Sequence, residues 1–125
     1  MTKNPNVSVL VVDDFKEWRD QVRRLLQARP ELKVVAEACD GDEAVAKASE
    51  LQPDIILLDL ALPTIAGIEA ARIIRQRCPK SKILFLSQNT DNEIIEAAMA
   101  IGDGYVFKTK AAHDLLPAIT SVLSQ

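Results

Sequence analysis

The stretch "VSVLVVDDFKE", Val7–Glu17, decides the fold, because an apolar run in it leads directly into two charges. Residues 7–12 carry no charge and are almost continuously apolar, which is typical of a strand covered on both faces of a parallel sheet. Asp13 and Asp14 follow at once. Two like charges about 4 Å apart repel each other by roughly 4 kcal/mol at an effective dielectric constant of about 20. The pair therefore predicts either local hydrogen-bond partners or a cation between the carboxylates.

Short apolar runs alternate with helical patterns along the rest of the chain. The further strands are expected at 33–38, 54–59, 82–87 and 105–108. The first helix has an apolar stripe of Phe15, Trp18, Val22, Leu25 and Leu26, and the last one a stripe of Leu115, Leu116, Ile119, Val122 and Leu123. The other helices are expected near 42–52, 66–78 and 91–101. This alternation predicts an α/β fold with a parallel sheet, right-handed crossovers and helices on both faces. The run "RDQVRRLLQAR", 19–29, is expected to be a solvated helix face, with a partner surface as the alternative.

Composition narrows the class of protein. A chain of 125 residues that is 48% hydrophobic and 26% charged fits one domain, 1–125. We find neither the ~20 apolar residues of a membrane span nor a signal peptide, so we expect a cytoplasmic protein without membrane contact. The net charge is −3 and no basic stripe is visible, which argues against nucleic-acid contact by this domain itself. Cys39 and Cys78 match no metal motif and are expected to be reduced packing residues.

Polar side chains stand at the carboxyl ends of four of the predicted strands: Asp13 and Asp14, Asp59, Ser87 and Lys108. Ligands of open parallel sheets bind beyond the carboxyl ends of the strands, so these groups should converge. Their formal charge of −2 matches one divalent cation, and carboxylates favour Mg²⁺. Asp59 could then attack phosphorus, with the cation and Lys108 neutralising the phosphoryl charge and Ser87 donating to a phosphoryl oxygen.

Each of these residues also has a local alternative. Asp14 could be the N-cap of the first helix, paired with Glu17 in a capping box. Asp59 could cap a turn, Ser87 could bind backbone, and Lys108 could be a solvated charge at a strand end. These alternatives explain single residues. They do not explain four complementary groups at one edge of a sheet.

The motifs "VVDD", "LLDLALP" with a following glycine, "FLS" and "GYVFK" resemble the receiver domain of two-component response regulators, in order and over about Val7–Leu123. The resemblance implies a flavodoxin-like, doubly wound fold of five β–α units with the strand order 2-1-3-4-5. It also implies Mg²⁺-dependent phosphorylation of Asp59 by a sensor histidine kinase or a phosphotransfer protein. Such a domain is not an enzyme acting on a separate substrate. It catalyses its own phosphotransfer and slow autodephosphorylation.

The resemblance implies a role for each site residue. Asp14 and Asp59 would ligate Mg²⁺ directly together with the backbone carbonyl of Ala61, Asp13 would act mainly through water, Ser87 would be the switch hydroxyl, Tyr105 the switch aromatic residue and Lys108 the site ammonium. Phosphorylation would then reshape the face formed by the fourth helix, the fifth strand and the fifth helix. This face would control an output, for which we expect transcription.

Some positions depart from the family pattern. Thr109 stands where many receivers have proline, so the cis peptide bond common at that point is in doubt, and Ala66 precedes Gly67 in place of Asp or Asn. Ala61 and Asn89 occupy two variable positions that affect phosphoryl lifetime in this family. The residue pattern of "GDEAVAKASELQPDIILLDL" is most similar to that of receivers that precede a LuxR/NarL-type helix-turn-helix domain. The chain stops at Gln125, where such a linker would begin, so an excised receiver and a natural single-domain regulator both stay open, as does a homodimer.

Other classes of protein fit the sequence less well. A haloacid-dehalogenase-type phosphatase needs a second Asp two residues after Asp59, where Ala61 stands. A flavodoxin needs a phosphate cradle after the first strand, where "DDFKE" would repel phosphate, and no Rossmann or P-loop motif is present. The remaining alternative is a pseudo-receiver, an interaction module that never takes phosphate. Asp59 and Lys108 weigh against it.

Overall fold

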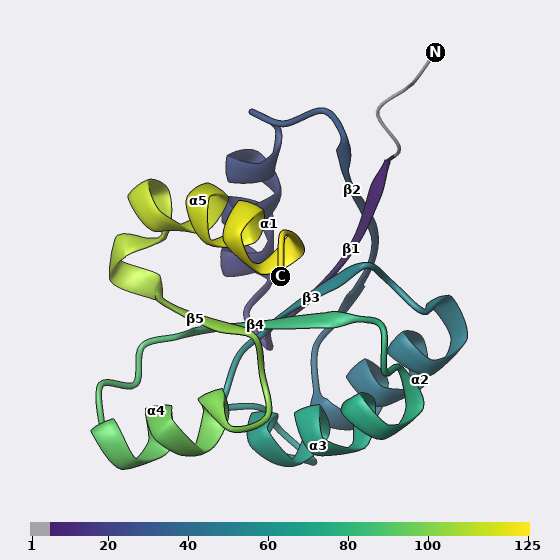
Figure 1. Cartoon of the computed structure of the whole chain (residues 1–125), viewed down its shortest axis with the longest axis vertical. Helices are drawn as coiled ribbons and strands as arrows, with labels where there is room; N and C mark the ends of the chain where they lie inside the picture. The colour runs from purple at the N-terminus through teal and green to yellow at the C-terminus, as the bar shows by residue number, and fades with distance from the viewer. Residues whose placement is uncertain (1–5) are drawn as a thin grey trace.

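The computed structural model describes residues 6–125 and contains five strands and five α-helices in strict alternation (Figure 1). The strands are β1 (Val7–Val12), β2 (Leu32–Ala38), β3 (Ile55–Leu58), β4 (Lys82–Ser87) and β5 (Gly104–Phe107). The helices are α1 (Lys16–Leu26), α2 (Gly41–Leu51), α3 (Gly67–Arg77), α4 (Asn92–Met99) and α5 (Ala111–Leu123), with a 3₁₀ turn at Lys108–Lys110 before α5.

The strands form one parallel sheet in the order β2-β1-β3-β4-β5. Helices α1 and α5 cover one face of this sheet, and α2, α3 and α4 cover the other (Figure 1). Alternate residues of a strand point to opposite faces, so the central strands supply both cores. Val9 and Val11 pack with α1 and α5, whereas Leu10 and Val12 pack on the other side. The predicted α/β fold and its strand order are confirmed.

The observed element bounds follow local chemistry. Helix α2 begins after Asp40, whose carboxylate accepts a hydrogen bond from the backbone N–H of Glu43. It ends at Leu51, and the C-cap residue Gln52 adopts a left-handed φ of 47° before Pro53. Helix α4 is shorter than predicted, since it ends at Met99. The prediction that Phe15 belongs to the buried stripe of α1 is wrong. Phe15 precedes the helix in an extended conformation and is 64% exposed.

Surface and cysteine predictions have mixed outcomes. Cys39 and Cys78 are both free thiols, but only Cys78 is buried, so the packing role predicted for Cys39 is wrong.

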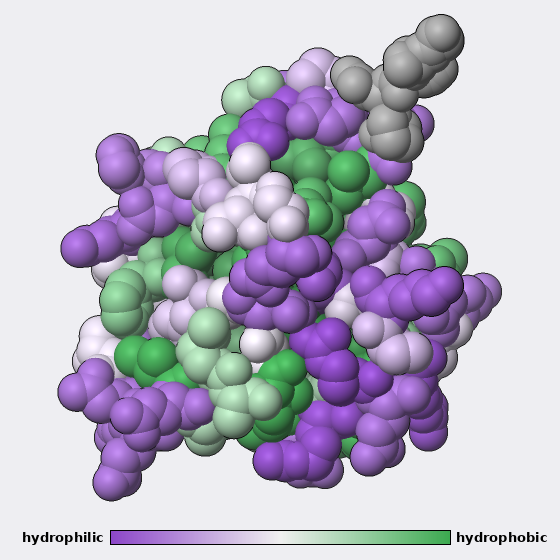
Figure 2. Space-filling model, viewed as in Figure 1, coloured by the Kyte–Doolittle hydropathy of each residue, from purple (hydrophilic) through white to green (hydrophobic). Residues whose placement is uncertain are grey.

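Within residues 6–125, no helix has the length and apolar character that a membrane span requires. Hydrophilic residues cover much of the face shown in Figure 2, and apolar surface is visible along its left margin between α5 and α4.

Candidate functional site

Asp13 lies at the carboxyl end of β1 and is 1% exposed. Its backbone N–H donates to the carbonyl of Ala38 at 3.0 Å, which extends the pairing of β1 with β2 by one residue. Its Oδ1 accepts from the N–H of Phe15 at 2.9 Å, and its Oδ2 accepts from Lys108 Nζ at 2.5 Å. Asp13 is therefore a fixed, buried carboxylate.

The capping box predicted as an alternative for Asp14 is wrong, because the N-cap of α1 is Phe15 and has no side-chain hydrogen bond.

Asp14 is exposed and adds the second carboxylate to the site. One carboxylate oxygen from each of Asp13, Asp14 and Asp59 lies within 4.8 Å of the other two. The three acids come from two neighbouring central strands, β1 and β3, so the sheet brings them together. The prediction that the acidic residues at these strand ends converge is confirmed.

Asp59 follows β3 and is 6% exposed. Its N–H donates to the carbonyl of Val12 at 3.2 Å, and its Oδ2 accepts from Lys108 Nζ at 3.3 Å. Burial raises the pKa of the Asp59 carboxyl above its ordinary value, and the charge of Asp13 adds to the rise. The Lys108 ammonium and the backbone N–H of Ala61 oppose it. Lys108 itself stands just after β5, at the start of the 3₁₀ turn, and its side chain is 10% exposed.

The loop between β3 and α3, residues 59–66, is held at both ends. The N–H of Gly67 donates to the carbonyl of Leu60 at 2.8 Å. A Cβ on Gly67 would lie 2.2 Å from the backbone oxygen of Asp59, so only glycine fits this close approach. At the middle of the loop, Thr64 has a left-handed φ of 66°, and its hydroxyl oxygen accepts from the N–H of Asp42 at 3.1 Å. The start of α2 thus anchors the loop that carries Ala61.

Ser87 and Tyr105 are linked through the residue Asn89. Ser87 is 3% exposed, and its Oγ accepts from the N–H of Asn89 at 3.1 Å. The Tyr105 hydroxyl donates to the carbonyl of the same Asn89 at 2.8 Å. The two predicted switch residues therefore contact opposite sides of one loop residue. Sequence patterns gave no sign of this backbone role for Asn89.

A cleft of about 470 Å³ opens beside these groups. It is lined by Asp59, Ala61, Ser87, Asn89 and Lys108, and Ile68 and Ile94 are among its apolar lining residues. A small anionic group that enters the cleft reaches a carboxylate, a hydroxyl and an ammonium together. The three clustered carboxylates also fit a hard divalent cation, because oxygen ligands of this kind are what Mg²⁺ prefers.

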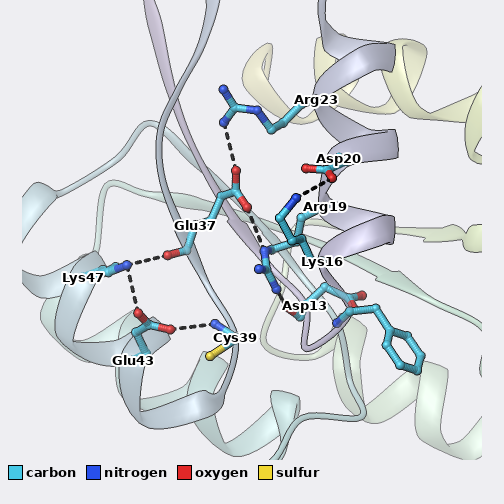
Figure 3. Close-up of polar contacts among 10 residues, drawn as sticks. Asp13, Lys16, Arg19, Asp20, Arg23, Glu37, Cys39, Glu43 and Lys47 are labelled. Atoms are coloured by element: carbon cyan, nitrogen blue, oxygen red, sulfur yellow. Dashed lines mark hydrogen bonds and ion pairs between the residues drawn. The ribbon is translucent and has the colours of Figure 1, made fainter.

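Arg19 is a further residue at this edge, and the prediction that 19–29 presents a solvated helix face is wrong for its side chain. The Arg19 side chain is 15% exposed, and its Nη1 donates to the backbone carbonyl of Asp13 at 2.7 Å. Its Nε donates to Glu37 Oε1, also at 2.7 Å (Figure 3).

At Lys108–Thr109, where the family pattern left the peptide geometry in doubt, the bond is trans, as are all peptide bonds among residues 6–125.

Comparison with known proteins identifies the family. A model of the response regulator receiver domain matches residues 9–120. The chain belongs to the response regulator receiver family. The transcriptional regulatory protein DegU of Brevibacillus brevis is 35% identical to this receiver over 117 residues, which is 93% of this chain and 50% of that protein. The chain spans about half the length of the curated relatives it matches.

Solved structures agree with this assignment. A LuxR-family response regulator from Aurantimonas sp. SI85-9A1 superposes on the receiver with a TM-score of 0.90 and 37% identity, over 95% of this chain and 86% of that one. The response regulator domain of Thermotoga maritima CheB gives 0.86 and 30% identity, over 96% and 98% of the two chains. The predicted resemblance to receivers of LuxR/NarL-type regulators is thereby confirmed.

Proposed function

We propose that residues 1–125 form a receiver domain that takes a phosphoryl group on Asp59 from a sensor histidine kinase or a phosphotransfer protein. One observation carries the proposal: three carboxylates lie within 4.8 Å of one another, and the Lys108 ammonium lies 3.3 Å from the Asp59 carboxylate. The cleft at Asp59 supports it, because the cleft gives a phosphoryl donor access to an otherwise buried nucleophile.

In this proposal the carboxylates of Asp13, Asp14 and Asp59 and the backbone carbonyl of Ala61 hold Mg²⁺, with Asp13 acting mainly through water. When bound, the cation stabilises negative charge on the transferring phosphoryl group. An Asp59 carboxylate oxygen forms the new bond to phosphorus, while the bond from phosphorus to the donor's histidine nitrogen breaks and its electron pair returns to that nitrogen. Lys108 neutralises charge on the phosphoryl oxygens, and the same site supports slow autodephosphorylation.

Ser87 is suited to form a hydrogen bond to the phosphoryl group and so to respond to phosphorylation. Its oxygen already accepts from Asn89, which leaves its own O–H free to donate to a phosphoryl oxygen. Movement of Ser87 toward the phosphoryl group would pull Asn89 and change the hydrogen bond that Tyr105 makes to it. Phosphorylation would thereby alter the α4-β5-α5 face, which includes the half-buried Tyr105, the exposed Met99 and the apolar margin in Figure 2.

The output of the switch is proposed to be transcription. DegU and LnrK are both named as transcriptional regulatory proteins, and this chain covers 50% and 54% of their lengths. We propose that the receiver acts with a helix-turn-helix output domain and does not itself contact DNA, which agrees with its net charge of −3. A homodimer through the switched face is a further part of this proposal.

Intact mass spectrometry after incubation with acetyl phosphate and Mg²⁺ tests the proposal. The wild-type chain should gain one phosphoryl group, and a chelator should prevent the gain. Asp59→Asn should gain none. The matched control is Asp54→Asn, because Asp54 lies just before the same strand but at its opposite end and is exposed. Labelling of Asp59→Asn, or none in wild type and Asp54→Asn, would contradict the proposal, and the second result would favour a pseudo-receiver.

A further inference from the structure

We propose that Arg19 is a positioning residue for the metal-binding acids, because it fixes the peptide bond that joins Asp13 to Asp14. This inference rests on the proposed function, in which these acids hold Mg²⁺. The contact that carries it is the 2.7 Å hydrogen bond from Arg19 Nη1 to the backbone carbonyl of Asp13. That carbonyl and the N–H of Asp14 belong to the same planar peptide unit, so holding one fixes the orientation of the other.

The Asp13 carbonyl needs a partner from outside the sheet. The Asp13 N–H still pairs with β2, and the preceding carbonyl, that of Val12, accepts from the N–H of Asp59. Asp13 is also held through both of its carboxylate oxygens, by Phe15 and Lys108. With Arg19, all four polar atoms of Asp13 are engaged. The peptide plane that leads into the exposed Asp14 is then fixed, and with it the position of the Asp14 Cα from which the carboxylate side chain extends.

Arg19 is itself held by an ionic network that reaches across to α2 (Figure 3). Glu37 on β2 accepts from Arg19 Nε at 2.7 Å and, through its other oxygen, from Arg23 Nη1 at 3.0 Å. The backbone carbonyl of Glu37 accepts from Lys47 Nζ at 2.6 Å, and Lys47 pairs with Glu43 at 2.9 Å. A guanidinium held at one end by a carboxylate presents its remaining N–H groups in a fixed direction.

A positioning role and a purely electrostatic role predict opposite results. Arg19 brings a positive charge close to a site for a dication, so its charge alone opposes Mg²⁺ binding. Removing that charge would therefore tighten Mg²⁺ binding if Arg19 acted only through its field. If Arg19 positions the acids, the same substitution weakens binding. Partners that orient metal ligands typically change metal affinity by about 10-fold to 100-fold when they are removed.

The test is Mg²⁺ titration of the folded chain by isothermal titration calorimetry. Quenching of Trp18, the single tryptophan, whose ring centroid lies 5.2 Å from Lys108 Nζ, gives a second readout. We expect Arg19→Met to raise the Kd for Mg²⁺ by roughly 10-fold. Arg19→Lys keeps the charge but loses the guanidinium fork, and it should raise the Kd in the same direction. The matched control is Arg23→Met, because Arg23 lies one turn later on α1 and shares Glu37 but makes its bond to Glu37 alone. It should leave the Kd unchanged or slightly lower.

Rates of phosphorylation by acetyl phosphate separate positioning from general damage. Arg19→Met should be phosphorylated more slowly than wild type at limiting Mg²⁺, and raising the Mg²⁺ concentration should recover much of the lost rate, as weakened metal binding requires. If wild type binds Mg²⁺ and both Arg19 variants bind it equally well or more tightly, the positioning role is wrong while the proposed function stands. If wild type does not bind Mg²⁺, the proposed function fails and this inference with it. Should Arg19→Met not fold, Arg19→Lys alone decides by the same criterion.

Discussion

Replacing Lys108 with methionine would leave two buried carboxylates together without their ammonium. Lys108 Nζ lies 2.5 Å from Asp13 Oδ2 and 3.3 Å from Asp59 Oδ2, and the two acids are only 1% and 6% exposed. The variant can relieve the repulsion by binding one proton. For a carboxyl with an ordinary pKa of about 3.9, staying protonated at pH 7 costs about 4 kcal/mol, which sets an upper limit on the loss. We expect the free energy of unfolding to fall by about 3 kcal/mol at pH 7, in the range for broken buried ion pairs.

The pH dependence of this loss has a definite sign. Without Lys108, the folded-state pKa of Asp59, which burial already raises, rises further above its unfolded value. Such a group contributes stability that is fully present below the unfolded pKa and is lost as the pH rises through the folded pKa. The deficit of Lys108→Met relative to wild type should therefore be small at about pH 4 and grow toward pH 7. Mg²⁺ at pH 7 should also reduce it, since the cation replaces the missing positive charge.

Urea unfolding at the two pH values, with and without Mg²⁺, measures these differences. Lys110→Met is the matched control, because Lys110 lies in the same 3₁₀ turn but is exposed. It should lose little stability at either pH. A deficit of Lys108→Met that is the same at both pH values, or a deficit of equal size in Lys110→Met, would refute the reasoning.

Three other changes test the remaining contacts of the site. Gly67→Ala places a Cβ 2.2 Å from the backbone oxygen of Asp59. Urea unfolding should therefore show that the free energy of unfolding falls by about 1–3 kcal/mol, and labelling by acetyl phosphate should slow. A variant that matches wild type in both measurements would contradict the close approach. The carboxyl of Glu43 has its pKa lowered to about 2 by its lysine partner, so the stability it contributes is present above its ordinary value of 4.5 and is lost as the pH falls toward 2. Because Glu43 is 35% exposed, Glu43→Gln should cost only about 1 kcal/mol at pH 7, and this gap should close in acid; a gap independent of pH would argue against it. Ser87→Ala should still be phosphorylated, yet beryllofluoride should shift the amide signals around Tyr105 less than in wild type, and a full shift would show that the two residues are not coupled.

The sequence predicted the sheet well because each strand is a separate apolar run. The strand bounds differ from the predicted ones by no more than one residue at either end. Parallel topology then brings all carboxyl ends to one edge, so the convergence of Asp13, Asp14 and Asp59 also followed from the sequence. Predicting that these acids lie together requires only the strand order and the identity of the residue that follows each strand.

Contacts to backbone atoms could not be predicted in this way. The bonds from Arg19 to the Asp13 carbonyl and from Tyr105 to the Asn89 carbonyl end on groups that every residue carries, so side-chain identity gives no signal for them. Phe15 was misplaced for a related reason. Its spacing matches the stripe of α1, but the bond from its N–H to Asp13 Oδ1 holds it outside the helix.

The ion pair of Lys108 with Asp13 joins residues 95 positions apart, and this separation has a consequence for synthesis of the chain. The carboxylates come from the first half of the receiver, whereas the ammonium comes directly after β5, its last strand. A nascent chain that has emerged only as far as α4 holds the acids without their ammonium. Since domains generally fold as units, the proposed acceptor site would form only when the last strand of the receiver is in place. The proposed acceptor site is thus complete only in a receiver that has been synthesised through Lys108.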